Sequence, residues 1–265
     1  MKVAVLMSGN MYNYKHSYNT IIDNLLKPYD CDLFIYTTYK NKIRDYPENL
    51  DITQEERRKI EEMFSPYLKQ IVFSEEDPTY SDELKIESER YLKCIENFTY
   101  ETPECYYYGP AHVRQIDQYF RVLKCLKMSK KYGKYDVVIR CRPDDYIKKP
   151  IILKNVTDRT IFCLGPGSID KLYEGNFVSE HFFYGTEESI EYFLENFIRN
   201  YGTFRERVIL YDRIDATLSP ESQFTQFCKN YNLNMVHNNY DIGYETKPTQ
   251  SYPNITDMIS FYTIK

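Results

Sequence analysis

Short apolar runs alternate with amphipathic segments along the first part of the chain. Val3 to Met7 is an unbroken apolar run that predicts a buried strand, and the polar loop Ser8-Gly9-Asn10 follows it. Apolar residues recur at helical spacing between 18 and 26, and Cys31 to Thr38 has the pattern of a second strand. The order strand, helix, strand predicts an α/β domain with a parallel sheet.

The segment from 41 to 105 is more charged and less regular than the sequence on either side of it. Thr53 and Glu56 have the spacing of a capping box, which predicts a helix that ends at Met63 or Phe64. We expect a strand over 70–74 and a charged helix over 82–96. The segment holds too few apolar residues to bury a core of its own, so we interpret it as an elaboration of a single domain that covers 1–265.

The second half of the chain continues the alternation of helices and strands. Apolar positions at steps of three and four predict a helix that includes Val113 and exits near Gly133, and the apolar run Val137 to Ile139 predicts the next strand. The remaining expected elements are strands over 160–164, 177–185 and 234–237, a helix with Ile190 and Ile198 on its inner face, and a helix from Ser219 with Pro220 at its first position. The fold class predicted is α/β, with a mixed, mostly parallel central sheet flanked by helices.

Charge and composition argue against several classes of protein. The chain has 34 basic and 39 acidic residues and a formal net charge of −5, so it lacks the basic footprint of a nucleic-acid-binding protein. No run of about 18 apolar residues occurs, so we expect no membrane span. The apolar run at the N-terminus is too short for a signal peptide, so we expect a cytoplasmic protein. Seven widely spaced cysteines form no Cys-x-x-Cys pair, which argues against a zinc site or a redox motif.

Charged residues gather directly after the apolar run that ends at Ile139. Arg140, Arg142, Asp144 and Asp145 lie within six positions, and charges at the end of a buried strand are costly unless they are paired. Ligands of open α/β sheets bind beyond the carboxyl ends of the strands. Guanidinium groups grip phosphates, and a carboxylate binds a ribose hydroxyl or a divalent cation. The spacing therefore fits a nucleoside diphosphate site, and it fits equally an ion-pair network that anchors a loop.

The segment "YDVVIRCRPDD" resembles the YDxVIRxRPD signature of a group of glycosyltransferase-like proteins from large DNA viruses, microbes and plants. Four other segments are similar, in order, to further parts of that family. "KVAVLMSGNMYNY" resembles its opening strand and SG loop, and "YDCDLFIYTTY" its second strand. "NFVSEHFFYGTEESIEYF" resembles its acidic segment and the following helix, and "LSPESQFTQFCKNYNLNM" its late helix and strand. The resemblance spans most of the chain apart from about 41–105.

The resemblance implies a GT-A type fold, in which a nucleotide-sugar-binding half joins an acceptor half around one central sheet. It implies a UDP- or GDP-linked sugar as donor, a hydroxyl of a glycan or another molecule as acceptor, and, if the chain is viral, action in the host cytoplasm. In the family an Asp-x-Asp motif orients a divalent cation, Mn²⁺ or Mg²⁺, on the donor diphosphate. The matching positions here are Arg142, Pro143 and Asp144, with Asp145 as an extra acid.

This departure from the motif leaves two alternatives. Arg142 neutralises the diphosphate directly, or Asp144 and Asp145 chelate a metal together after a turn, with His237 as a further candidate ligand. We favour the metal here. In either case Arg140, Arg142 and Asp144 are expected to hold the diphosphate and ribose and to stabilise the charge that develops on the leaving group.

The resemblance also assigns roles to residues outside the strand tip. The loop Ser8-Gly9-Asn10 lines the donor pocket, although a plain strand-to-helix turn explains it nearly as well. Arg114 opens the long helix, where the family often has polar residues that face the donor, although a solvated helix face explains this residue better. Glu180 is the first candidate for the base that deprotonates the acceptor hydroxyl, and Glu221 is the second.

Two other functions are open at this stage. A non-catalytic nucleotide- or glycan-binding module derived from a transferase fold would carry the same residues without turnover. A nucleotidyltransferase would carry a glycine-rich phosphate loop after its first strand, and Ser8-Gly9-Asn10 is a poor version of one.

Overall fold

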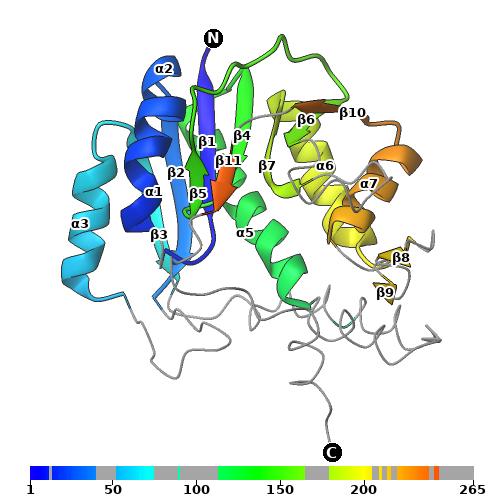
Figure 1. The fold of residues 1–265 in the computed structure, drawn as a ribbon, viewed down its shortest axis with the longest axis horizontal. Helices are drawn as coiled ribbons and strands as arrows, with labels where there is room; N and C mark the ends of the chain where they lie inside the picture. Colours follow the sequence, from blue (N-terminus) through cyan, green and yellow to red (C-terminus); the bar gives the residue numbers. More distant parts are fainter. Residues whose placement is uncertain are drawn as a thin grey trace, which may run out of the picture.

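The fold is built around one twisted, mostly parallel sheet (Figure 1). The computed structural model describes residues 1–11, 14–39, 52–74, 89, 113–164, 179–204, 209–210, 214–215, 220–238 and 242–244. Within these residues the central sheet has seven strands in the order β10-β6-β7-β4-β1-β2-β3. The strands are β1 (Val3–Ser8), β2 (Asp32–Thr38), β3 (Leu68–Ser74), β4 (Val137–Cys141), β6 (Thr160–Leu164), β7 (Ser179–Gly185) and β10 (Asn234–Asn238). The α/β class and the mostly parallel sheet predicted from the sequence are confirmed.

The strand directions determine which strand ends lie together at one edge of the sheet. β1 pairs in parallel with β2 and with β4, β2 with β3, and β6 with β10. β7 runs antiparallel to both of its neighbours, β4 and β6. The first residues of β7 therefore lie beside the last residues of β4. The carboxyl ends of the parallel strands and the start of β7 share one edge of the sheet.

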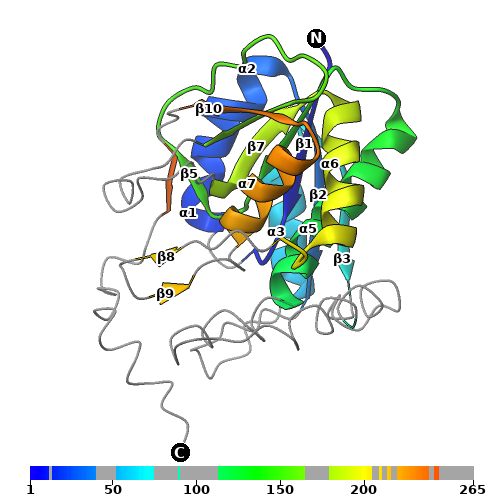
Figure 2. The ribbon, with the colours of Figure 1, turned by 90° about the vertical axis from the view of Figure 1, so that its right-hand side faces the viewer.

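Helices cover both faces of this sheet (Figures 1 and 2). One face carries α1 (Tyr14–Ile21), a π-helical segment (Ile22–Leu26), α2 (Lys27–Tyr29) and α3 (Gln54–Phe64). The other face carries α5 (Val113–Ser129), α6 (Glu187–Asn200) and α7 (Pro220–Asn230). Each face has its own apolar cluster because side chains alternate along every strand between the two helical layers.

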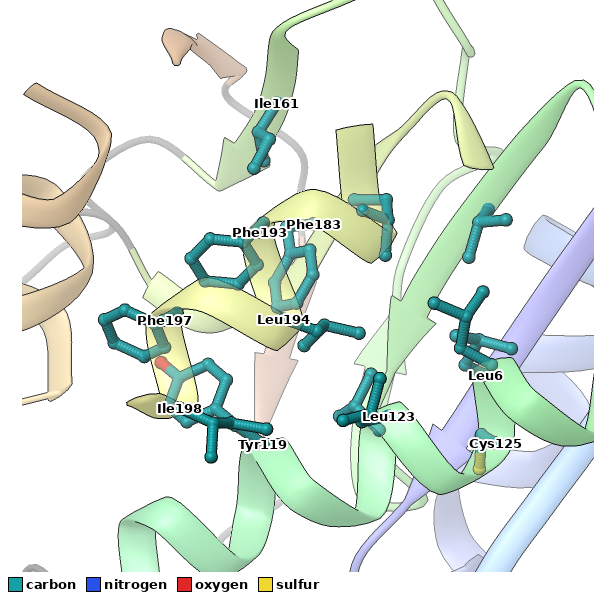
Figure 3. Close-up of a cluster of buried hydrophobic side chains, with 14 of the residues drawn as sticks. Leu6, Tyr119, Leu123, Cys125, Ile161, Phe183, Phe193, Leu194, Phe197 and Ile198 are labelled. Atoms are coloured by element: carbon teal, nitrogen blue, oxygen red, sulfur yellow. The ribbon is translucent and has the colours of Figure 1, made fainter. Parts of the chain in front are cut away.

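Several aromatic rings pack together in the core on the α5, α6 and α7 face (Figure 3). The ring of Phe193 on α6 stacks on Phe197 with centroids 4.9 Å apart and meets Phe183 of β7 edge-on at 5.5 Å. Tyr119 of α5 packs edge-on against Phe197 at 4.7 Å. Burial of each large apolar side chain stabilises the fold by about 1.5–3 kcal/mol, so this cluster fixes α5 and α6 against the sheet.

The first helix begins earlier and ends later than predicted. The expectation was a helix over 18–26, but helical structure starts at Tyr14 and continues through the π-helical segment and α2 to Tyr29. Pro28 has no N–H to donate to the Asn24 carbonyl four residues before it, and this carbonyl instead accepts a hydrogen bond from the Ile151 backbone N–H at 2.9 Å. Asp30 then ends the helix in a left-handed conformation with φ of 48°.

The described part of the charged middle segment adds the strand β3 to the central sheet and the helix α3 to the layer on the α1 face. The capping box is confirmed, because the Thr53 Oγ1 accepts a hydrogen bond from the Glu56 backbone N–H at 3.2 Å and Glu56 accepts one from the Thr53 N–H at 3.1 Å. β3 pairs with β2 at the edge of the sheet. Ile60 and Phe64 of α3 join the apolar cluster on the α1 face.

Four short strands among the described residues were not predicted from the sequence. β5 (Asp145–Ile147) pairs with β11 (Ile242–Tyr244), and β8 (Ile209–Leu210) pairs with β9 (Ile214–Asp215). Two or three residues are too few to show a period-2 pattern. The helix predicted over 82–96 lies outside the described residues, apart from position 89.

No helix in the described part of the chain is both long enough and apolar enough to cross a membrane. The cysteines in the same part of the chain are buried thiols outside any disulfide, namely Cys31, Cys125, Cys141, Cys163 and Cys228.

Candidate functional site

The candidate site lies where the strand order of the sheet reverses. From β1 the chain moves to β2 and β3 on one side, and it then crosses to β4 on the other side of β1. The carboxyl ends of β1 and β4 are direct neighbours, since Met7 pairs with Cys141. In open α/β sheets this switch point is the usual place for a ligand.

The loops after β1 and β4 meet at this switch point. Gly9 has φ of +126°, a conformation that side chains rarely adopt, which explains the glycine. A Cβ atom at Gly9 would lie 3.7 Å from Pro143 Cδ. The loop after β1 and the turn after β4 therefore form one continuous surface.

A tight turn follows β4 because its residues bind one another. The strand ends at Cys141, and the Asp145 backbone N–H donates to the Arg142 carbonyl at 3.3 Å. The Asp145 carboxylate in return accepts a hydrogen bond from the Arg142 backbone N–H at 2.7 Å. The Ser17 hydroxyl of α1 donates to the Pro143 carbonyl, which fixes the turn against the first helix. The extended chain that would have put Arg140, Arg142 and Asp144 on one face therefore ends before the acids.

The short strand β5 continues from this turn and is tied to the first helix. The Ile147 backbone N–H donates to the Thr20 hydroxyl at 3.1 Å, and the Asn24 side chain donates to the Ile147 carbonyl at 2.6 Å. These bonds hold β5 against the first helix.

Arg142 and Asp144 form a two-pronged ion pair. The Arg142 Nε lies 2.7 Å from Asp144 Oδ1, and Nη2 lies 2.6 Å from Oδ2. The Arg142 side chain is 23% exposed and that of Asp144 is 10% exposed. Burial raises the pKa of Asp144, but the charge and hydrogen bonds of Arg142 outweigh it, so the pKa lies below its ordinary value.

His181 is a third member of this cluster. Its Nδ1 lies 2.7 Å from Arg142 Nη1. Because a guanidinium has N–H donors and no acceptor, His181 Nδ1 must accept, and the ring carries its proton on Nε2. His181 reaches Arg142 because β7 starts beside the end of β4.

Arg140 is directed into the protein interior. The whole residue is 1% exposed, and its Nη1 donates a hydrogen bond to the His181 carbonyl. It thereby holds the start of β7 against β4. The predicted contact between Arg140 and a donor stays a prediction.

Asp145 is fully buried below the turn. Burial and the neighbouring charge of Asp144 raise the pKa of Asp145 to about 7, while the positive charges of Arg142 and Arg140 act in the opposite direction.

The described side chains at the predicted metal positions do not fit the divalent cation that the family resemblance implies. Both oxygens of Asp144 bind Arg142, and Asp145 is buried on the backbone of the turn. His237 lies on β10, and the strands β6 and β7 separate it from β4, which corresponds to about 14 Å. Within the described residues, no group of three or more His, Cys, Asp or Glu side chains could hold a metal.

The remaining predicted site residues lie around the same edge of the sheet. Ser8 ends β1 and is buried, and its hydroxyl has no hydrogen-bond partner among the described residues. Asn10 is half-buried in the following loop. Glu221 is half-buried in the first turn of α7, which precedes a parallel strand and so starts at this edge.

Two predicted residues are described by their backbone alone. Glu180 lies in β7 directly before His181, which places it at the carboxyl end of β4. Arg114 lies in the first turn of α5. Their predicted roles as base and donor ligand concern side chains outside the described residues.

The sequence analysis missed His181 and Ser17. The position of His181 directly after Glu180, in an otherwise apolar strand, was the one feature of the sequence that pointed to this residue. Its contact with Arg142 spans 39 positions and depends on the direction of β7.

No protein-family model matches the chain, and a comparison with curated protein sequences gives no match either.

Proposed function

We propose that the chain is a glycosyltransferase of the GT-A type that moves a sugar from a nucleoside diphosphate donor to a hydroxyl group of an acceptor. One observation carries the proposal: the Arg142 guanidinium is held, partly exposed, at the switch point between β1 and β4. A fixed guanidinium at this place suits a phosphate group, and the Gly9 loop beside it lets a ligand approach the backbone closely. The GT-A fold belongs to the same broad class of architecture, a mostly parallel sheet with helices on both faces.

The chemistry assigns each group a task. The acceptor oxygen forms a bond to the anomeric carbon of the sugar. The bond between that carbon and the diphosphate oxygen breaks, and its electron pair stays on the leaving diphosphate. The acceptor proton passes to a base, for which Glu180 is the first choice and Glu221 the second.

Arg142 then stabilises the charge that grows on the leaving diphosphate. Asp144 and His181 keep the guanidinium in a fixed orientation. Groups oriented before the reaction stabilise a transition state without reorganising during it. In this proposal Asp144 is a positioning residue.

A non-catalytic binding module is the second candidate. The contacts among Arg142, Asp144 and His181 suit it equally, because they orient the guanidinium for binding and imply no turnover. Both functions share the nucleotide site, and turnover separates them.

A two-step experiment tests the proposal. Melting temperatures of the full chain are measured with UDP-, GDP-, ADP- and CDP-linked sugars, because a ligand at 100 times its Kd stabilises a protein by about 2.7 kcal/mol. Release of free nucleotide from any stabilising donor is then followed, with Arg142→Lys as the test variant and Arg58→Lys, an exposed position on α3, as the control. Stabilisation with release that Arg142→Lys lowers supports a transferase. Stabilisation without release supports the binding module, and no stabilisation by any donor rejects both.

A further inference from the structure

We propose that Arg142 takes the place of a divalent cation at the donor diphosphate, so that donor binding and sugar transfer require no metal. This inference rests on the proposed transferase function and specifies how its donor site neutralises charge.

The Asp144 carboxylate is already bound by Arg142. Its two oxygens accept the parallel hydrogen bonds of Arg142 at 2.7 and 2.6 Å. A divalent cation prefers oxygen ligands, and it would have to bind these same oxygens next to a guanidinium of like charge. The ion pair and the metal therefore exclude each other.

The turn presents a cation, and not its acids, to a ligand. The Arg142 side chain is 23% exposed, whereas that of Asp144 is 10% exposed and Asp145 is fully buried. The acids face inward, and the cation is the most accessible charge of the three. A surface of this kind attracts an anion such as a diphosphate.

The Arg142 guanidinium is already held in one orientation. Asp144 binds Nε and Nη2, and His181 accepts from Nη1, so contacts on two sides fix the plane of the group. A guanidinium has five N–H donors, and a phosphate would be bound in parallel by the second N–H of Nη1 and the second N–H of Nη2, a pair that a lysine ammonium does not reproduce. Both neighbours thus orient Arg142 for an anionic ligand.

Titration calorimetry of the full chain with UDP and with GDP tests the proposal, first in EDTA and then in excess Mn²⁺. We expect the nucleoside diphosphate that binds to have the same Kd, within about twofold, in both buffers. Arg142→Lys should weaken binding about tenfold or more in both, because one hydrogen bond to a charged group is lost. Arg58→Lys is the control, and the melting temperature of each variant confirms that it is folded.

Each of the other outcomes contradicts a different part of the proposal. Binding that needs Mn²⁺ rejects the metal-free site and leaves the transferase proposal standing. Binding in EDTA that folded Arg142→Lys does not weaken removes Arg142 from the site. If neither nucleotide binds in either buffer, and no other donor stabilises the chain, the transferase proposal fails as well.

Discussion

The guanidinium of Arg142 and the carboxylate of Asp144 lie in a parallel, two-pronged arrangement, two residues apart in a turn that follows a buried strand. Two neighbouring charges meet in this way because Pro143, between them, interrupts the extended chain. The pair links the fold to the proposed function, since the same contact stabilises the turn and orients the cation.

A double-mutant cycle should detect this contact as a coupling. Asp144→Ala leaves Arg142 without its two-pronged partner, and we expect it to lower the free energy of unfolding by about 1–3 kcal/mol. Arg142→Ala should cost a similar amount, and the double variant should cost less than the sum of the two. Urea unfolding measures all four proteins. The control is the exposed pair Lys59–Glu55, which has the same 2.6 Å separation and should show a much smaller coupling. Equal coupling in the two pairs would contradict the structural role given to Asp144.

Parts of the fold followed from the sequence wherever a pattern repeats over many residues. The inner face of α6 carries Ile190, Phe193 and Phe197 at steps of three and four, and all three residues are buried. The same regularity is absent from β5 and β11, whose three residues each depend on a partner strand almost a hundred positions away. Long elements carry their own signal, and short ones take their conformation from the tertiary structure.

The location of the candidate site could be predicted from the sequence, but most contacts among its side chains could not. The charges after Ile139 and the glycine at position 9 indicated a site beyond the ends of two strands, where the structure has both loops. The burial of Arg140 and the contact between Arg142 and His181 depend on β7 lying antiparallel beside β4. A single sequence does not specify that neighbour, so the residues that orient the cation were not identified.

Asp145 should make stability fall as the pH rises from about 4 to about 7. Its pKa is raised from 3.8 to about 7 in the folded chain, so the folded state holds a proton in this window that the unfolded state has lost. The stabilisation is complete below the unfolded pKa and disappears as the pH passes the folded value. We expect Asp145→Asn, which stays neutral, to lack this fall, with a difference on the order of a few kcal/mol.

Melting curves of both proteins from pH 4 to pH 8 measure the effect. The lowered pKa of Asp144 acts in the opposite direction and below this window, so it does not mask the difference. Parallel pH profiles for Asp145→Asn and the unmodified chain would mean that the Asp145 carboxyl is not the group that titrates.

Gly9→Ala should weaken nucleotide binding more than its effect on stability explains. The φ of +126° at Gly9 disfavours any side chain, so we expect a loss of about 1–3 kcal/mol or a shift of the loop next to Pro143. The matched control is Gly133→Ala, because Gly133 has a similar φ of +116° and lies at the opposite edge of the sheet, beside Lys2. Both variants should lose stability by comparable amounts. The Gly9 variant alone should raise the Kd of the nucleoside diphosphate in titration calorimetry, since its loop adjoins the turn that carries Arg142. An equal change in Kd for both variants, or none for either, would show that the loop after β1 takes no part in the donor site.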